Sequence, residues 1–353
     1  MGKRIFYFDA LRALAIICVV VIHVAAQVRV LMPADMNHVF TGGVLLEAFC
    51  NNSFRIGVDL FLVLSGALSL GREWKIRDFL SKRIPRIAKP FVFWVLFNSL
   101  ILIGFSYFFT QIHYTSSFDL ISILKFIMDS YLGKAPSSVQ NWFFWMIIGT
   151  YLIMPIFNKW LLHADLKEVE YFLVIWLFVS LVENTLGMKS PIKLTYFTSP
   201  IGLVVLGYYL RHTKRSFLNN KYIGILLIIC SSVLMLALSY TFFTGTFFKT
   251  FNRYSILNII EVIGIVCLFK TSGIFETPRA PLKKVAGALA KTSYGIYLVQ
   301  CPIINISSSF LPKAELGITK SFIILFTLGV VVSYLLVTLA SKIPFLEEYS
   351  GSK

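Results

Sequence analysis

Long apolar runs alternate with short polar stretches along the whole chain, and the polar stretches carry most of the charged residues. A helix needs about 20 apolar residues to cross roughly 30 Å of hydrocarbon, so runs of this length predict membrane-spanning helices. The pattern predicts an all-α, polytopic transmembrane helix bundle of about ten spans, and we expect a single domain over residues 1–353. The candidate spans cover residues 5–26, 54–71, 90–110, 141–158, 170–187, 197–211, 221–243, 254–271, 292–311 and 318–341.

Two segments fit this pattern less well. The run at 197–211 is short and contains Pro200, Gly202 and Gly207, which is typical of a broken or partly inserted helix with its backbone buried in protein. The polar connection at 111–140 is either an extracytoplasmic lid or a long loop, and we favour the loop.

Composition agrees with a membrane protein. Hydrophobic residues make up 57% of the chain and charged residues 14%, whereas soluble domains have about 45–50% and about 25%. The net charge of +16 comes from basic residues in short loops. With the N-terminus inside, the inner segments hold 22 Lys and Arg and the outer segments 10, so the positive-inside rule predicts two cytoplasmic termini and contact with membrane lipids. This rule accounts for the basic excess without a nucleic-acid partner.

The cysteines give no sign of a metal site. Four of the five lie in apolar runs, and no two form a CxxC pair. We therefore expect neither a disulfide framework nor a bound metal.

The first span contains ionisable residues at Asp9, Arg12 and His23. Charged groups inside a membrane are costly and usually functional, so these three are candidate catalytic residues. Asp9 and Arg12 are three positions apart and can pair on one helix face. Arg12 and His23 are eleven apart, which is three turns plus about 20°, so they share a face at about 16 Å along the axis. The alternative is an interfacial anchor with a packing histidine.

Further ionisable residues lie in or beside later spans. Arg55 and Asp59 form a candidate i,i+4 pair, with either a structural or a substrate-binding role. Lys82, Arg83 and Arg86 form a basic cluster at the inner mouth, suited to lipid headgroups or, if the segment is helical, to the phosphates of an anionic cosubstrate. Glu183 and Glu261 are secondary candidates, and Trp142 is an interface anchor or a substrate contact.

Several of these stretches together resemble the acyltransferase family 3 membrane proteins. The matching motifs run in order along nearly the whole chain and include the spacing of Arg12 and His23. They are Phe8-Asp9-x-Leu11-Arg12, Gly57-Val58-Asp59-Leu60-Phe61 with Ser65-Gly66, Arg83-x-x-Arg86-Ile87-x-x-Pro90, Trp142-Phe143 with Tyr151-Leu152 and Pro155-Ile156, Gly207-Tyr208, and Ser293-Tyr294-Gly295-Ile296-Tyr297-Leu298. Within the family, the chain is similar to compact sugar O-acetyltransferases such as the enzyme that acetylates enterobacterial common antigen.

The resemblance implies transfer of an acyl group, usually acetyl from acetyl-CoA, to a hydroxyl of a cell-surface glycan or lipid-linked sugar in the cytoplasmic membrane of a prokaryote. It implies that His23 is the general base, that Arg12 contacts the donor or positions the site, and that Asp9 orients Arg12. Arg83 and Arg86, with Lys82, would then bind the CoA phosphates. The oligomeric state is left open.

Two positions depart from the family pattern. Many members carry histidine where this chain has Gln140 and Gln300. Glutamine can hydrogen-bond a sugar but cannot exchange a proton near neutral pH. Either these positions bind substrate only, or the specificity or activity of the chain has changed.

Two rival functions share the same sequence features. An exporter of a polysaccharide or lipid-linked sugar would also have about ten spans with buried charges, but transporters often show paired internal repeats, and none is evident here. A catalytically reduced homologue that senses or scaffolds a polysaccharide assembly system would fit the two glutamines.

Overall fold

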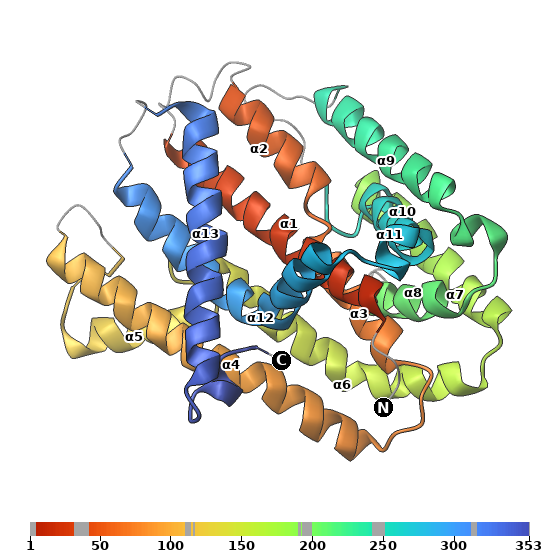
Figure 1. Ribbon diagram of the computed structural model, residues 1–353, viewed down its shortest axis with the longest axis horizontal. Helices are drawn as coiled ribbons and strands as arrows, with labels where there is room; N and C mark the ends of the chain where they lie inside the picture. Colours follow the sequence, from red (N-terminus) through yellow and green to blue (C-terminus); the bar gives the residue numbers. More distant parts are fainter. Residues whose placement is uncertain are drawn as a thin grey trace. The chain divides into compact units, whose positions relative to one another are not determined.

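The computed structural model describes residues 5–31, 42–109, 114–115, 117–189, 192, 200–241, 251–311 and 316–352, and these are helical with no strands (Figure 1). The predicted all-α class is confirmed. The α-helices are α1 (Phe6–Leu31), α2 (Gly42–Ser53), α3 (Gly57–Ser69), α4 (Ile76–Phe108), α5 (Leu120–Tyr131), α6 (Trp142–His163), α7 (Leu166–Val179), α8 (Ile201–His212), α9 (Lys221–Thr241), α10 (Ile256–Thr271), α11 (Gly273–Glu276), α12 (Ala280–Ser309) and α13 (Gly317–Lys342).

Five helical segments in the described ranges are long and apolar enough to cross a membrane. They are Phe6–Leu31, Ile76–Phe108, Val139–His163, Lys221–Ser239 and Gly317–Lys342. The predicted spans at 54–71 and 197–211 correspond to the 13-residue α3 and the 12-residue α8. At 1.5 Å per residue each is about 20 Å long or less, which is shorter than the hydrocarbon core. The total number of spans and the cytoplasmic termini stay predictions.

The chain forms two compact units. Unit 1 comprises residues 1–25, 34–74 and 153–290, and unit 2 comprises residues 26–33, 75–152 and 291–353. Helices α1, α6 and α12 contribute residues to both. The single domain expected from the sequence stays a prediction.

The centre of unit 1 is a close contact between α3 and α8 (Figure 1). A β-carbon at Gly66 would lie 1.7 Å from the Val204 carbonyl oxygen, and one at Gly207 would lie 1.9 Å from the Val63 carbonyl oxygen. The two backbones therefore touch at reciprocal glycines, a packing typical of membrane helices. Gly57 allows the same approach of α3 to α1, because its β-carbon would lie 2.7 Å from the Ala15 carbonyl oxygen.

Helix α7 continues into a π-helical segment, Ser180–Thr185. The Thr185 hydroxyl oxygen accepts a hydrogen bond of 2.9 Å from the Ile256 backbone N–H, at the first residue of α10. The π segment therefore satisfies one of the four free N–H groups at the start of α10. Glu183, a secondary candidate from the sequence, lies in this segment and is half-buried.

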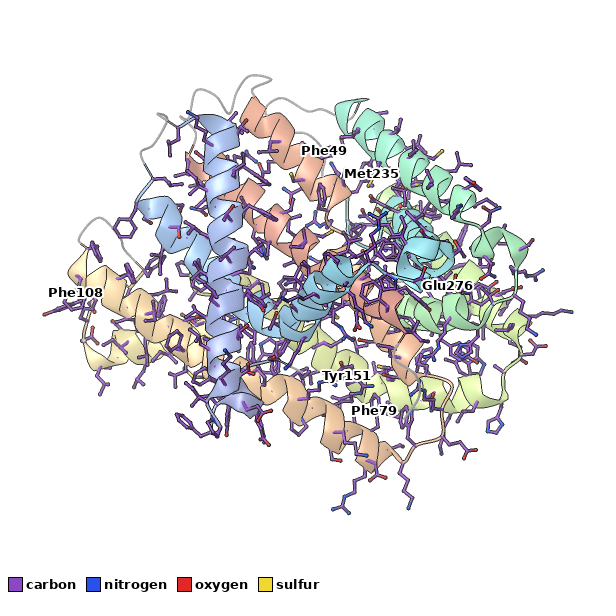
Figure 2. All side chains as sticks on the ribbon, in the orientation of Figure 1. Phe49, Phe79, Phe108, Tyr151, Met235 and Glu276 are labelled. Atoms are coloured by element: carbon purple, nitrogen blue, oxygen red, sulfur yellow. The ribbon has the colours of Figure 1, made fainter. Side chains whose placement is uncertain are left out.

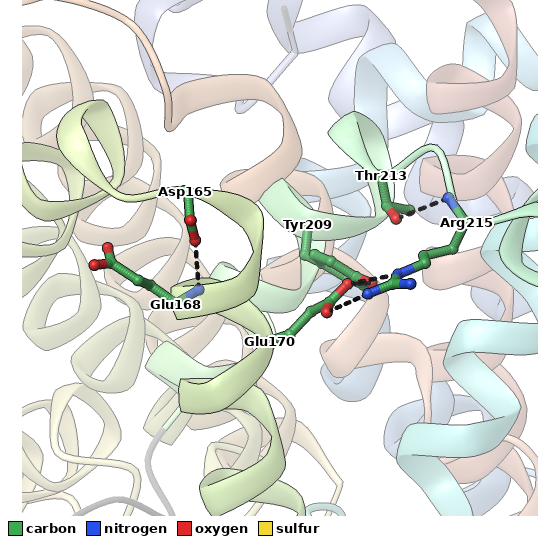
Figure 3. Close-up of polar contacts among 6 residues, drawn as sticks. All are labelled: Asp165, Glu168, Glu170, Tyr209, Thr213 and Arg215. Atoms are coloured by element: carbon green, nitrogen blue, oxygen red, sulfur yellow. Dashed lines mark hydrogen bonds and ion pairs between the residues drawn. The ribbon is translucent and has the colours of Figure 1, made fainter.

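The start of α7 and the end of α8 are joined by a polar contact, drawn in Figure 3. The Glu170 carboxylate accepts from the Tyr209 hydroxyl at 2.6 Å and from Nε and Nη2 of Arg215 at 3.0 and 2.8 Å. This bidentate geometry is the strongest that arginine forms with a carboxylate. It raises the pKa of Arg215, which lies in the loop after α8, above its ordinary value.

Unit 2 is assembled around the motif at Tyr294–Tyr297 in α12. The Tyr294 hydroxyl donates to the Ile87 carbonyl at 2.9 Å, and the Tyr297 hydroxyl donates to the Gln140 carbonyl at 2.6 Å. Gly295 leaves room for the C-terminal segment, since its β-carbon would lie 2.5 Å from the Ser350 carbonyl oxygen. One turn of α12 therefore holds α4, the residues before α6 and the C-terminal segment.

The segment at 111–140, for which we favoured a loop, contains α5 in its described part, so that prediction is wrong. Asp119 caps α5, and its carboxylate accepts from the Ser122 backbone N–H at 3.0 Å. The helix packs beside α4, with Phe126 buried and Leu120, Ile121 and Leu124 exposed. Its 12 residues are too few to span a membrane, so a search for spans misses it.

Candidate functional site

Asp9, Arg12 and His23 lie on one uninterrupted helix, α1. Asp9 is buried, whereas Arg12 and His23 are both half-buried. Because the helix has no break between them, the eleven-residue spacing keeps the last two on one face, about 16 Å apart. The pairing of Asp9 with Arg12 and the catalytic roles of all three stay predictions.

A second cation lies at the start of α1 that the sequence did not reveal. The Arg211 guanidinium, from the last turn of α8, lies 5.6 Å from the centre of the Phe8 ring. The same group donates to the Ala67 carbonyl at 2.5 Å. Arg211 thus joins α8 and α3 to the first turn of α1, beside the Phe8-Asp9 motif.

Arg55 and Asp59 act on each other electrostatically, but not through the helical i,i+4 geometry that the sequence predicted. Helix α3 begins at Gly57, so Arg55 lies in the preceding turn rather than one helical turn below Asp59. The Arg55 Nη1 donates instead to the Phe251 carbonyl at 3.2 Å. Asp59 is fully buried, and within the described part of the chain neither of its oxygens has a hydrogen-bond partner.

Asp59 nevertheless lies among other charged groups of unit 1. The positive charges of Arg253 and Arg55 both act on its carboxylate. Arg253 is 194 positions away in sequence and was not a candidate from the sequence. Nothing in the local pattern around residue 253 indicates this partner, because only the packing of the segment before α10 brings it close.

Glu261, a secondary candidate from the sequence, lies in the same region. It is 4% exposed, and its Oε1 accepts from the Ser232 hydroxyl of α9 at 3.3 Å, whereas Oε2 has no hydrogen-bond partner among the described residues. Unit 1 therefore contains two buried carboxylates, one on α3 and one on α10.

The basic cluster lies in unit 2, in the first half of α4. The segment is helical, as phosphate binding by Arg83 and Arg86 requires, and Lys82 and Arg86 are exposed. The Arg83 guanidinium lies 5.8 Å from the centre of the Phe79 ring, which meets Tyr151 edge-on at 6.0 Å (Figure 2). The Arg83 side chain therefore packs against the aromatic pair. No described hydrogen bond, ion pair or ring contact involves the side chains of Lys82 and Arg86.

Gln140, Trp142 and Gln300 also lie in unit 2. Gln140 is in the 3₁₀ turn Val139–Asn141, and its Nε2 donates to the Ser137 carbonyl at 3.1 Å. Trp142 is half-buried and is the first residue of α6, one position after the predicted start of that span at 141. Gln300 is fully buried in α12, with its Nε2 2.9 Å from the Cys301 sulfur.

A small cavity in unit 2 has Gln140 in its wall. It is about 10 Å³, which is room for about one water molecule. Its lining comes from α4, from the end of α5, from the turn before α6 and from α12. The lining residues are Val95, Asn98, Ser99, Leu102, Ser130, Ser137, Ser138, Gln140, Asn141 and Pro302.

The described residues contain no cluster of three or more His, Cys, Asp or Glu side chains that could bind a metal ion. The predicted site residues fall into two groups. Asp9, Arg12, His23, Arg55 and Asp59 belong to unit 1. Lys82, Arg83, Arg86, Gln140, Trp142 and Gln300 belong to unit 2.

The apolar helices and the ionisable residues buried among them define an integral membrane protein with polar chemistry inside its helical core. The family model described as an acyltransferase domain, that of acyltransferase family 3, matches residues 5–342. The chain belongs to this family and is a membrane acyltransferase. No curated protein and no solved structure matches it.

Proposed function

We propose that the protein transfers an acyl group, with acetyl-CoA as the donor, to a hydroxyl of a cell-surface glycan or lipid-linked sugar. The reaction would take place in the cytoplasmic membrane of a prokaryote. The observation that carries this proposal is a half-buried histidine, His23, on the same unbroken helix as Arg12, in a chain of the acyltransferase family.

The chemistry requires a base for the acceptor hydroxyl. In the proposed reaction His23 accepts the hydroxyl proton as the oxygen attacks the thioester carbonyl, since a neutral imidazole with a pKa near 6.5 suits this role. The carbon–sulfur bond then breaks as the new ester forms. The imidazolium returns its proton to the CoA thiolate, so acyl-CoA and alcohol give ester and CoA thiol.

The remaining predicted residues would bind and position the substrates. Arg12 contacts the donor and Asp9 orients Arg12. Lys82, Arg83 and Arg86 would bind the CoA phosphates, which is supported by their helical segment and by the exposure of Lys82 and Arg86. Arg55, Asp59, Gln140, Trp142 and Gln300 are the proposed acceptor contacts, and the burial of hydrogen-bonding groups at Asp59 and Gln140 supports this assignment.

Replacing His23 tests the proposal directly. We expect His23→Ala to abolish acetylation of host glycans, measured by mass spectrometry and by incorporation of label from acetyl-CoA, with the protein still present in the membrane. General-base groups contribute about 10²–10⁴-fold to rate, so the loss should be of that size.

The matched control is His163→Ala, which changes an exposed histidine at the end of α6. Its activity should equal that of the wild type. Full acetylation by the His23→Ala protein would refute the role of His23, and failure of the wild type to consume acetyl-CoA would refute the proposed donor.

A further inference from the structure

The cavity in unit 2 is polar but uncharged. Seven of its ten lining residues are serine, asparagine or glutamine, and none is acidic or basic. A phosphate or carboxylate would enter this space without a cation to balance it, which is costly in a buried site. The lining therefore favours a neutral, hydrogen-bonding group.

The hydrogen bonds of the lining residues show which donors and acceptors are still available to a ligand. The hydroxyls of Ser99, Ser130 and Ser138 donate to the carbonyls of Val95, Phe126 and Ala135 at 2.8, 2.8 and 2.6 Å. These three hydroxyl donors are therefore occupied, whereas the lone pairs of the hydroxyl oxygens can still accept hydrogen bonds.

The amide side chains in the lining also leave mainly acceptors available. Asn98, Gln140 and Asn141 each donate one N–H to a backbone carbonyl at 2.8 to 3.1 Å. Their side-chain oxygens accept no hydrogen bond from the described part of the chain. The cavity therefore offers mainly acceptors, with a few amide N–H donors, and an alcohol hydroxyl can satisfy both.

Proline explains why Asn98 is held at this place. Pro302 has no N–H, so the Leu298 carbonyl four residues earlier in α12 loses its helical partner. The Asn98 Nδ2 takes that place at 2.9 Å. The amide group is thereby fixed in the cavity wall by the backbone of another helix.

Ser137 shows that the other wall is also strongly constrained. Its φ of +62° is the one positive value for a non-glycine residue in the described ranges, and such a conformation costs about 1–3 kcal/mol. It is held by Asn305, whose Nδ2 donates to its hydroxyl oxygen at 2.5 Å. Strain of this kind clusters at binding sites.

We propose that this cavity is a subsite for one hydroxyl of an uncharged, polyhydroxylated ligand, namely a sugar ring of the acceptor. The assignment of the ligand as the acceptor rests on the proposed function. The binding chemistry rests only on the cavity, whose size matches one hydroxyl group or, in its place, one water molecule.

The test uses the full chain in lipid nanodiscs with neutral probes. Methyl β-D-glucoside, methyl β-D-galactoside and methyl N-acetyl-β-D-glucosaminide are compared with methyl β-D-glucuronide, which has a carboxylate, by ligand-observed NMR. We expect at least one neutral glycoside to bind and the glucuronide to bind at least roughly tenfold more weakly. Equal binding of the glucuronide, or no binding of any neutral probe, would overturn the proposal.

The decisive variant is Ser99→Thr, which keeps the hydroxyl that bonds the Val95 carbonyl and adds one methyl group to a cavity of one-water size. It should weaken glycoside binding roughly tenfold. The matched control is Ser231→Thr in unit 1, because Ser231 is equally buried at 1% and donates to the carbonyl four residues earlier at 2.7 Å. Unchanged binding by Ser99→Thr would overturn the proposal, and Ser99→Val replaces it if the threonine protein does not fold.

The two proposals fail in different ways. Glycoside binding that depends on Ser99, in a protein that never consumes acetyl-CoA, would support the subsite and refute the proposed reaction. Acetylation of host glycans that is unaffected by Ser99→Thr, in a protein that binds none of the neutral probes, would retain the reaction and remove the subsite.

Discussion

Glycine residues decide how closely the helices of unit 1 approach one another. At Gly66 and Gly207 the facing backbone occupies the place that a side chain would need, with carbonyl oxygens at 1.7 and 1.9 Å from the β-carbon positions. Neither carbonyl can move without shifting its helix. The contact of α3 with α8 therefore tolerates no side chain at these two positions.

We expect Gly66→Ala to destabilise the protein by about 1–3 kcal/mol or more, because the added methyl group forces the two helices apart. Thermal unfolding in detergent would measure it. The matched control is Gly287→Ala in α12, where a β-carbon meets no atom within 4 Å. The control should be neutral or stabilising by about 0.5–1 kcal/mol, since alanine favours a helix over glycine. A Gly66→Ala protein as stable as the wild type would contradict this contact.

Asp59 and Arg253 offer a second test at the scale of single residues. Arg253 is one of two arginines that act on the fully buried Asp59, so the effects of Asp59→Asn and Arg253→Gln on stability should be coupled. The double variant should lose less than the sum of the two, with a coupling of about 0.5–3 kcal/mol in the same unfolding assay. Strict additivity would show that the two charges act independently.

At the scale of elements, the cap of α5 makes this helix sensitive to acid. Hydrogen bonds from the Ser117 hydroxyl and the Ser122 backbone N–H hold the pKa of Asp119 below its ordinary value. A carboxylate with a depressed pKa stabilises the folded state above its unfolded pKa, near 3.9, and this contribution is lost as the pH falls toward the folded value.

We therefore expect amide exchange in the first turn of α5 to accelerate, relative to the chemical rate, as the pH is lowered from about 5 to 3. Hydrogen exchange with mass spectrometry measures this. Asp119→Ala should exchange rapidly at every pH, while Asp129→Asn, which changes a carboxylate within the same helix, should behave as the wild type. Protection that is independent of pH in the wild type would refute the role of the cap.

Helices within the long apolar runs could be predicted from the sequence, including the short α3, α8 and α10, whereas helices outside these runs could not. The long runs gave α1, α4, α6, α9 and α13, because spanning a membrane demands continuous apolar residues. Helix α5 was not predicted because the search was for runs long enough to span a membrane. Asp119 and the apolar spacing after it are signals that a shorter window would detect.

The candidate site was predictable only where it lies on one helix. Asp9, Arg12 and His23 share α1, so their relation follows from helical geometry alone. Arg55 and Asp59 act on each other electrostatically, but the predicted i,i+4 geometry is absent because α3 begins only at Gly57. Arg211, Arg253 and the Ser137 turn come from distant segments, and no local pattern specifies such contacts.

At the scale of the whole molecule, the charge distribution predicts the orientation in the membrane. The segment at 72–89 should face the cytoplasm and the segment at 111–140 the outside. In a variant without native cysteines, Ser81→Cys should react with a membrane-impermeant maleimide only after the cells are opened, whereas Lys134→Cys should react in intact spheroplasts. Both positions are exposed, so access alone is tested. The reverse labelling pattern would show that the orientation in the membrane is opposite to the predicted one.

The shortness of α3 and α8 also bears on how the chain is synthesised. Neither is long enough to be inserted alone as a span, and each buries one face against the other. Gly66 and Gly207 are 141 positions apart, so at about 5–20 residues per second roughly 7 to 28 s separate their emergence from the ribosome. During that interval α3 has no α8 to pack against. A ribosomal pause before residue 212 would lengthen the exposure of α3 to membrane proteases.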